Sequence, residues 1–139
     1  MRKLVVCVLF LALGVSNAWA ASLVAKVDIS NQTMTVIRNG VVAYSWKVST
    51  GAKGYRTPTG SYSPQRLHRM WYSSKYANSP MPHSIFFRGG YAVHGTDQIR
   101  KLGRPASHGC VRLHPSHAAR LFALVKAHGP KNTRIVVQN

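Results

Sequence analysis

The sequence predicts a mainly β domain, an antiparallel β-sandwich or partly closed barrel with one α-helix near the C-terminus. The first observation is Asn39-Gly40, which lies between two runs rich in Val, Thr, Ile, Tyr and Trp. This pattern predicts a tight hairpin, because both central residues of a type I′ turn need positive φ. The second is that only residues 114–129 have a convincing helical spacing of apolar residues. The third is the absence of repeats, so hairpins around one core are the economical architecture.

The N-terminal half predicts three antiparallel strands followed by irregular structure. Residues 23–30, 32–38 and 41–50 are rich in β-branched and aromatic residues. Residues 51–64 are rich in Gly, Thr and Pro and predict a long turn. Residues 65–84 mix basic and aromatic residues without a sustained period and contain two prolines, so we interpret them as a loop or lid.

The C-terminal half predicts a second hairpin, one helix and a last strand. The hairpin covers 84–96, turns at Gly89-Gly90 and ends at His94. Residues 97–106 have room for one short helical turn, and 133–138 form the closing strand. Within the 114–129 helix Pro115 suits the first turn and Gly129-Pro130 end it. One helix face gathers four apolar residues, namely Ala118, Leu121, Phe122 and Val125.

Residues 1–20 have the layout of a secretory signal peptide. Arg2 and Lys3 precede an apolar run, and Ala18 and Ala20 form a cleavage site of the A-x-A type. The run is shorter than the roughly 20 apolar residues that a spanning helix needs. We therefore expect export to the periplasm or cell wall, no transmembrane anchor in the mature form, and a single domain over residues 21–139.

The mature chain is strongly basic. Loss of Arg2 and Lys3 leaves 17 Lys plus Arg against Asp28 and Asp97, a net charge of about +15. Most of these cations have no carboxylate partner within the protein, so they are solvated or face an anionic cell-wall or envelope polymer. Two aspartates far apart in the chain also argue against a carboxylate pair for glycoside hydrolysis and against a Ser-His-Asp triad.

Cys110 is the one cysteine of the mature chain, because Cys7 leaves with the signal peptide. A lone thiol in an oxidising compartment is either buried and inert or present to react. A nucleophilic thiol needs a base, and His94 at a strand end could supply one. Gly109 lets the chain turn sharply, so that backbone N–H groups near the thiol can face a developing oxyanion.

Two other interpretations of Cys110 stay open at this stage. The residue could be a small buried hydrophobic group, although its sequence neighbours are Gly, His and Arg. It could also be a zinc ligand together with His94, His108 and His114, although their spacing matches no common zinc finger. We expect no metal and no other cofactor.

The segment "HGTDQIRKLGRPASHGCVRL", from His94 to Leu113, resembles the catalytic segment of the L,D-transpeptidases, the YkuD-domain cysteine enzymes of bacterial cell walls. Their pattern is a His, a spacer of somewhat over ten residues, Ser/Thr-His-Gly-Cys and then Arg or Asn two residues after the cysteine. Three further pieces follow in family order: "VDISNQTMTVIRNG", "VSTGAKGYRTPTGSY" and "MPHSIFFRGGYAVHG". The resemblance covers nearly the whole mature chain.

This resemblance implies a catalytic pair. Cys110 would be the nucleophile, and His94 would be its base and later the general acid. The backbone carbonyl of Gly95 would orient the His94 ring, in the place that an aspartate takes in other triads.

The resemblance also implies roles for the residues around the thiol. His108 and Gly109 would belong to the oxyanion segment together with Cys110. Ser107 starts that segment, and with Arg112 it would contact the substrate, Arg112 lying near a carboxylate of the stem peptide.

The implied substrates are peptidoglycan stem peptides, and the implied reaction is acyl transfer through a thioester with loss of D-alanine. An amine acceptor would give 3→3 cross-links, D-amino acid exchange or lipoprotein attachment, and water would give L,D-carboxypeptidase activity. A cell-wall-modifying toxin on the same fold is an alternative. A secreted basic module that binds a polyanion is an alternative of another class; it explains the charge but not the His-Cys segment, and we expect no nucleic acid partner.

Overall fold

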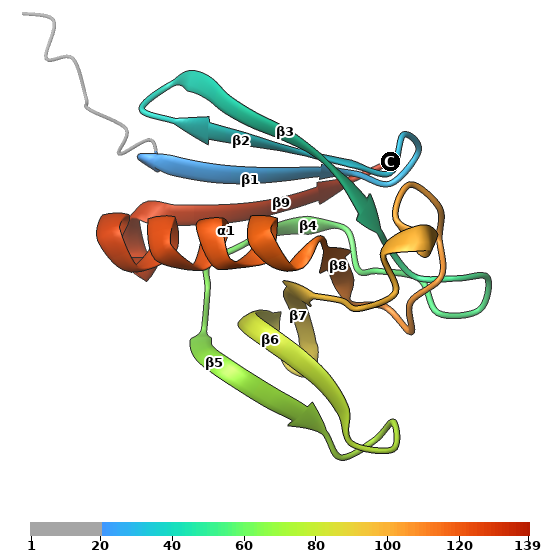
Figure 1. The fold of residues 1–139 in the computed structure, drawn as a ribbon. Helices are drawn as coiled ribbons and strands as arrows, with labels where there is room; N and C mark the ends of the chain where they lie inside the picture. Colours follow the sequence, from blue (N-terminus) through green and yellow to red (C-terminus); the bar gives the residue numbers. More distant parts are fainter. Residues whose placement is uncertain (1–20) are drawn as a thin grey trace, which may run out of the picture.

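The computed structural model describes residues 21–139, and its first element is a three-stranded meander (Figure 1). Strands β1 (Leu23–Asp28), β2 (Thr33–Arg38) and β3 (Val41–Ser49) are antiparallel neighbours. Asn39 and Gly40 have φ of 49° and 78°, which confirms the hairpin turn predicted from the Asn-Gly pair. The predicted signal peptide, with Cys7, lies outside the described residues.

All strands of residues 21–139 join one curled sheet of nine strands in the order β4-β9-β1-β2-β3-β8-β7-β6-β5. The mainly β fold with one helix near the C-terminus is therefore confirmed. The remaining strands are β4 (Gly60–Tyr62), β5 (Arg66–Ser73), β6 (Ser79–Arg88), β7 (Tyr91–Gly95), β8 (Val111–Leu113) and β9 (Thr133–Gln138). The predicted short helical turn is the 3₁₀ helix Ile99–Lys101, and a second 3₁₀ turn covers Pro130–Asn132.

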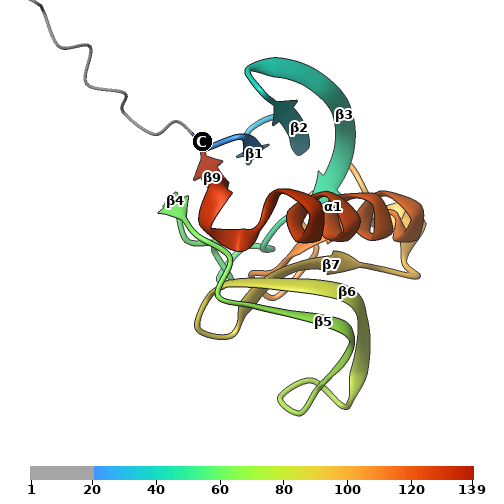
Figure 2. The ribbon, with the colours of Figure 1, turned by 90° about the vertical axis from the view of Figure 1, so that its left-hand side faces the viewer.

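Helix α1 (Pro115–His128) lies inside the curl of the sheet, with β1, β2, β3 and β9 on one side and β5, β6 and β7 on the other (Figures 1 and 2). Its four predicted apolar residues are all buried. They meet side chains that alternate along the strands, as Leu23, Ala25 and Val27 do in β1, because successive strand residues point to opposite faces. The core therefore lies between the helix and both halves of the sheet.

The expectation of continuous antiparallel pairing is wrong at two places. Strand β9 runs parallel to β1, and β8 runs parallel to β7. Parallel strands that follow one another need a long crossover, and residues 96–110, which include the 3₁₀ helix Ile99–Lys101, make this connection between β7 and β8. Helix α1 then leads from β8 to β9. Strand β8 has only three residues, too few to be recognised from periodicity.

Residues 65–84 are a second correction, since most of this predicted loop belongs to the β5–β6 hairpin. Pro80 and Pro82 lie in β6 opposite Tyr72 and Met70. Prolines are tolerated there because β7 pairs only with the later part of β6, from Ile85 onward, so the first part has a single strand neighbour and an open edge.

Among residues 21–139, no helix has both the length and the apolar character needed to cross a membrane.

Candidate active site

His94 lies near the end of β7 and is almost completely buried, with 6% of its surface exposed. Its Nδ1 is 2.6 Å from the carbonyl oxygen of Gly95. A carbonyl only accepts hydrogen bonds, so Nδ1 carries the proton and Nε2 is left as the basic nitrogen. Burial lowers the pKa of His94 to about 4; the bond to Gly95 opposes this shift, and the cation of Arg112 adds to it.

Gly95 itself is a tightly packed position. A Cβ there would come within 3.1 Å of Pro82 Cγ and 3.3 Å of Pro115 Cα. A larger residue at 95 would therefore disturb both β6 and the start of α1. The predicted contact of the Gly95 carbonyl with the His94 ring is the 2.6 Å hydrogen bond to Nδ1.

Cys110 directly precedes β8, and the β7–β8 register brings it near His94. In that parallel pair Val93 faces Val111 and His94 faces Arg112. The free Cys110 thiol is half-buried, against the small apolar cluster of Met81, Phe86 and Ala92. Burial raises the pKa of Cys110, and the Ala92 N–H and the Arg112 cation partly oppose that shift.

No hydrogen bond joins Cys110 Sγ to His94 within residues 21–139. The thiol instead lies 3.9 Å from the carbonyl oxygen of Gly90. With the pKa of the base lowered and that of the thiol raised, both groups are neutral at pH 7. The resting site therefore holds a thiol and a neutral imidazole rather than an ion pair.

The turn over residues 107–110 is closed by the Ser107 side chain. Its hydroxyl donates to the carbonyl oxygen of Cys110 over 2.6 Å and accepts from the N–H of Gly109 at 3.0 Å. Ser107 is 1% exposed. Its hydroxyl is thus engaged in shaping the turn that carries the thiol, although the residue also lines the cavity next to it.

Two more residues hold this turn from the 51–64 loop side. Thr57 Oγ1 donates to the carbonyl oxygen of Gly109 at 2.8 Å and accepts from the N–H of Gly51 at 3.0 Å. The Ala52 N–H donates to the carbonyl oxygen of Ser107. The predicted long turn is therefore a structural support of the site.

A cavity of about 720 Å³ opens over the thiol. It is lined by five of the predicted site residues, namely His94, Ser107, His108, Cys110 and Arg112. The β5–β6 hairpin contributes further lining, including Trp71, Tyr76 and Met81. The structure thus brings the predicted catalytic pair into one hollow, large enough for a peptide segment.

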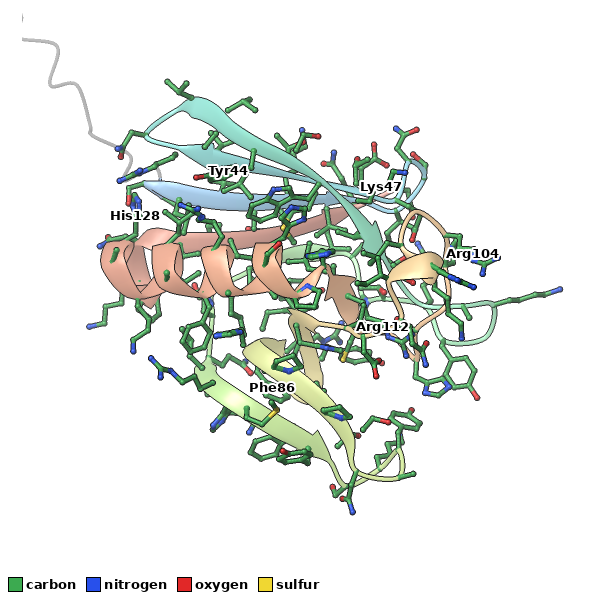
Figure 3. All side chains as sticks on the ribbon, in the orientation of Figure 1. Tyr44, Lys47, Phe86, Arg104, Arg112 and His128 are labelled. Carbon is green, nitrogen blue, oxygen red and sulfur yellow. The ribbon has the colours of Figure 1, made fainter. Side chains whose placement is uncertain are left out.

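Arg112 is half-buried beside the loop that follows β7, at the opposite end of α1 from His128 (Figure 3). Its Nη1 donates to Gln98 Oε1 at 3.3 Å and to the carbonyl oxygen of Ala106 at 3.5 Å. Neither bond neutralises the guanidinium, so Arg112 presents a cation to the cavity.

His108 is exposed and its ring packs against two tyrosines. The ring centroids lie 4.6 Å from Tyr55 and 4.2 Å from Tyr76. Tyr76 belongs to the tip of the β5–β6 hairpin, so this stack joins the hairpin to the turn that carries the thiol.

The zinc interpretation finds no geometric support. Across residues 21–139, no three side chains of His, Cys, Asp or Glu gather in a way that could hold a metal ion. His114 instead caps α1, where its Nδ1 accepts from the Ser116 N–H, and His117 stacks on Trp46 at 4.8 Å.

Sequence reasoning missed the supporting residues of the site. Thr57 belongs to a motif that resembles the family, but its residue type and neighbours indicate only a turn. Gln32 is 4% exposed, and its amide binds both the N–H and the hydroxyl of Thr50. The Thr50 carbonyl in turn accepts from the N–H groups of Ala106 and Ser107. No local pattern signals this long-range support.

Comparisons with known proteins point to one family. The family described as YkuD, L,D-transpeptidase catalytic domain, matches residues 22–137. The Bacillus subtilis (strain 168) protein named "Putative L,D-transpeptidase YkuD" is 24% identical over 115 residues, which cover 80% of this chain and 63% of that protein. The chain therefore spans less than two thirds of this relative.

Two solved structures share the fold. An L,D-transpeptidase from Mycobacterium smegmatis superposes with a TM-score of 0.76 at 22% identity, over 86% of this chain and 59% of that one. The LD transpeptidase LdtMt1 in complex with imipenem gives a TM-score of 0.75 at 26% identity, over 84% and 59% of the two chains. Together with a family match over nearly all of the described residues, they lead to one conclusion: this chain belongs to the YkuD family of L,D-transpeptidase catalytic domains.

Proposed function

We propose that the protein is a cysteine acyltransferase that acts on peptidoglycan stem tetrapeptides. The observation that carries the proposal is the placement of Cys110 and His94 in the lining of one cavity. The hydrogen bond from Nδ1 to Gly95 leaves Nε2 of a neutral imidazole to accept the thiol proton. Membership of the YkuD family supports the same chemistry.

The first half-reaction forms a thioester. His94 takes the proton of Cys110 as the sulfur attacks the carbonyl carbon of the third stem residue, and the carbonyl electron pair moves onto oxygen. When the tetrahedral intermediate collapses, the C–N bond to the terminal D-alanine breaks. His94 then returns the proton to the leaving amine. A base with a pKa of about 4 suits transfer within the attack rather than a thiolate formed beforehand.

The second half-reaction transfers the acyl group to whatever nucleophile enters. The side-chain amine of another stem gives a 3→3 cross-link, a D-amino acid gives exchange, a lipoprotein lysine gives anchoring, and water gives an L,D-carboxypeptidase. Delivery of the same chemistry against a rival's cell wall would make the protein a toxin.

The segment 65–84 is the proposed gate for the acceptor. It forms most of the β5–β6 hairpin, whose residues from Ser73 to Tyr76 line the cavity. The Tyr76–His108 stack connects the hairpin tip to the turn that carries the thiol. The tip therefore lines part of the cavity in which acceptors would compete.

Charge supports an acidic substrate. Arg66, Lys75, Lys101 and Arg112 line the cavity together with a single carboxylate, that of Asp97. A stem peptide with free carboxylates complements this lining. The remaining cations are available to an anionic cell-wall or envelope polymer, and the pattern of residues 1–20 supports action in the periplasm or cell wall.

The test of the function is incubation of the Ala21–Asn139 protein with a tetrapeptide-containing muropeptide, followed by mass spectrometry. Dimers indicate a transpeptidase, and loss of D-alanine alone indicates a carboxypeptidase. Cys110→Ala should abolish both. If folded wild-type protein leaves the muropeptide unchanged, the proposed enzymatic activity is refuted. Salt-sensitive binding of a polyanion that persists in Cys110→Ala would then favour the alternative of a polyanion-binding module.

A covalent inhibitor tests the nucleophile separately. Imipenem should add to Cys110, with a new S–C bond and an opened lactam ring. An adduct equally abundant on Cys110→Ser would contradict the assignment.

The role of residues 65–84 as a gate is tested by exchanging them for the matching segment of a relative and comparing the products. Unchanged product ratios would refute this role.

A further inference from the structure

The peptide bond between Gly109 and Cys110 is held in one orientation by a buried hydroxyl. Thr57 Oγ1 donates to the carbonyl oxygen of Gly109 at 2.8 Å, and it accepts from the Gly51 N–H at 3.0 Å. Thr57 is 1% exposed, so water does not compete for these bonds. With both its donor and its acceptor function used, the hydroxyl has one favourable orientation.

That orientation decides where the N–H of Cys110 points. In a planar trans peptide the carbonyl and the following N–H point in opposite directions. The Gly109 carbonyl points to buried Thr57, so the Cys110 N–H points away from it. This N–H has no hydrogen-bond partner within residues 21–139, whereas the N–H of Gly109 is already bound to Ser107 Oγ.

The Gly109 backbone makes such an external hold necessary. Its φ of 117° is a conformation that L side chains rarely adopt, and a Cβ there would lie 2.5 Å from Tyr91 Cε1. Glycine meets both demands but has many other conformations of similar energy. The bond from Thr57 selects one of them.

We propose that Thr57 is a positioning residue for the oxyanion hole, which acts by aiming the Cys110 N–H at the oxygen of the scissile carbonyl. The inference rests on the proposed function. As the S–C bond forms and negative charge develops on oxygen, this N–H donates to the oxyanion. When the C–N bond breaks, the charge returns to the carbonyl and the leaving nitrogen takes the proton from His94.

The test compares two reactions of the same thiol. Acylation by imipenem passes through an oxyanion, whereas alkylation by iodoacetamide displaces iodide at a saturated carbon and forms none. Thr57→Val keeps the shape of the side chain and removes the hydroxyl. We expect it to slow acylation about 10- to 100-fold, which is less than the loss of an oxyanion donor causes, because the N–H is only turned away. The alkylation rate should stay within about twofold.

Two variants serve as controls. Thr57→Ser keeps the hydroxyl and should restore most of the acylation rate. Thr133→Val removes another fully buried threonine hydroxyl, one that donates to the Gly129 carbonyl at 2.9 Å away from the site, and should leave both rates unchanged. If Thr57→Val does not fold, Thr57→Ala takes its place in the same comparison.

The outcomes separate the two proposals. If imipenem acylates the wild type and Thr57→Val equally fast, the positioning role of Thr57 is overturned and the proposed function stands. An equal slowing of acylation and alkylation would also overturn it, because a merely structural defect affects both reactions. Wild-type protein that alkylates but is never acylated would overturn the proposed function and the positioning role with it.

Discussion

His94 donates its Nδ1 proton to the carbonyl oxygen of the next residue, Gly95, over 2.6 Å. This bond between chain neighbours orients the ring without any carboxylate, in a described chain whose only acids are Asp28 and Asp97. A carbonyl dipole stabilises an imidazolium less than a full negative charge does. Burial therefore prevails and keeps His94 neutral, with a pKa of about 4.

The buried histidine should make stability depend on pH. Its pKa falls from 6.5 in the unfolded chain to about 4 in the folded one. Above pH 6.5 both states are neutral at this residue, and as the pH falls toward 4 the unfolded state alone takes up the proton. The free energy of unfolding should therefore drop by about 3 kcal/mol between pH 6.5 and 4. Urea denaturation across this range measures the drop, and His94→Gln should remove most of it; an unchanged slope in that variant would contradict the assignment.

The Cys110 thiol should react as a thiol of raised pKa. Burial raises its pKa above the ordinary value of 9.0, so the thiolate fraction at pH 7 is small. The rate of alkylation by iodoacetamide should keep rising with pH through 9. Stopped-time mass spectrometry from pH 5 to 10 checks this, and a plateau with a midpoint below pH 7 would instead indicate a preformed thiolate and imidazolium.

Gln32 should be a stability residue of the site. Its side-chain amide donates to Thr50 Oγ1 and accepts from the Thr50 N–H, with no water access. Gln32→Ala leaves these groups unpaired and should lower the free energy of unfolding by about 2–4 kcal/mol. The neighbouring Asn31→Ala, at an exposed position, removes the side-chain hydrogen bond to Asp28 Oδ2 and should cost less than about 1 kcal/mol. Equal losses in urea denaturation would refute the special role of Gln32.

Two glycines offer a matched pair for the turn around the thiol. Gly54 and Gly109 both have positive φ, but a Cβ meets nothing within 4 Å at Gly54 and meets the Tyr91 ring at Gly109. Gly54→Ala should cost about 1 kcal/mol of stability from backbone strain. Gly109→Ala adds overpacking of about 1–3 kcal/mol and should also slow imipenem acylation. Thermal unfolding and imipenem acylation rates measure both effects. Equal losses of stability and equal acylation rates in the two variants would contradict the crowding at Gly109.

The cavity cations should act on substrate binding rather than on chemistry. Lys75 and Lys101 line the cavity and are exposed. Replacing both lysines by glutamine should raise the KM for an acidic stem peptide several-fold and leave kcat within about twofold of the wild-type value. Lys26→Gln alters an exposed lysine of β1 outside the lining and should change neither constant. Steady-state kinetics at low and high salt measures the effect, and equal KM values in all three proteins would argue against an acidic substrate.

Features encoded by neighbouring residues could be predicted from the sequence. The Asn39-Gly40 turn, the four buried residues of α1 and the final strand all follow from local patterns, and each is present. The β5–β6 hairpin could not be predicted in this way. Its prolines are compatible with a strand only because part of β6 has an open edge, and that edge depends on where β7 stops pairing.

The sequence by itself determined which residues are candidates for the chemistry of this protein: Cys110, the one cysteine among residues 21–139, a histidine sixteen residues before it, and a motif that resembles one family. Only the tertiary structure decided how these groups are held. The parallel β7–β8 pairing brings His94 and Cys110 into one cavity, and the hydroxyl of Thr57 reaches the Gly109 carbonyl across 52 positions of sequence. The reason is physical, since side-chain type is local information, whereas the partner of a buried hydrogen-bonding group depends on which distant segments the core packs together.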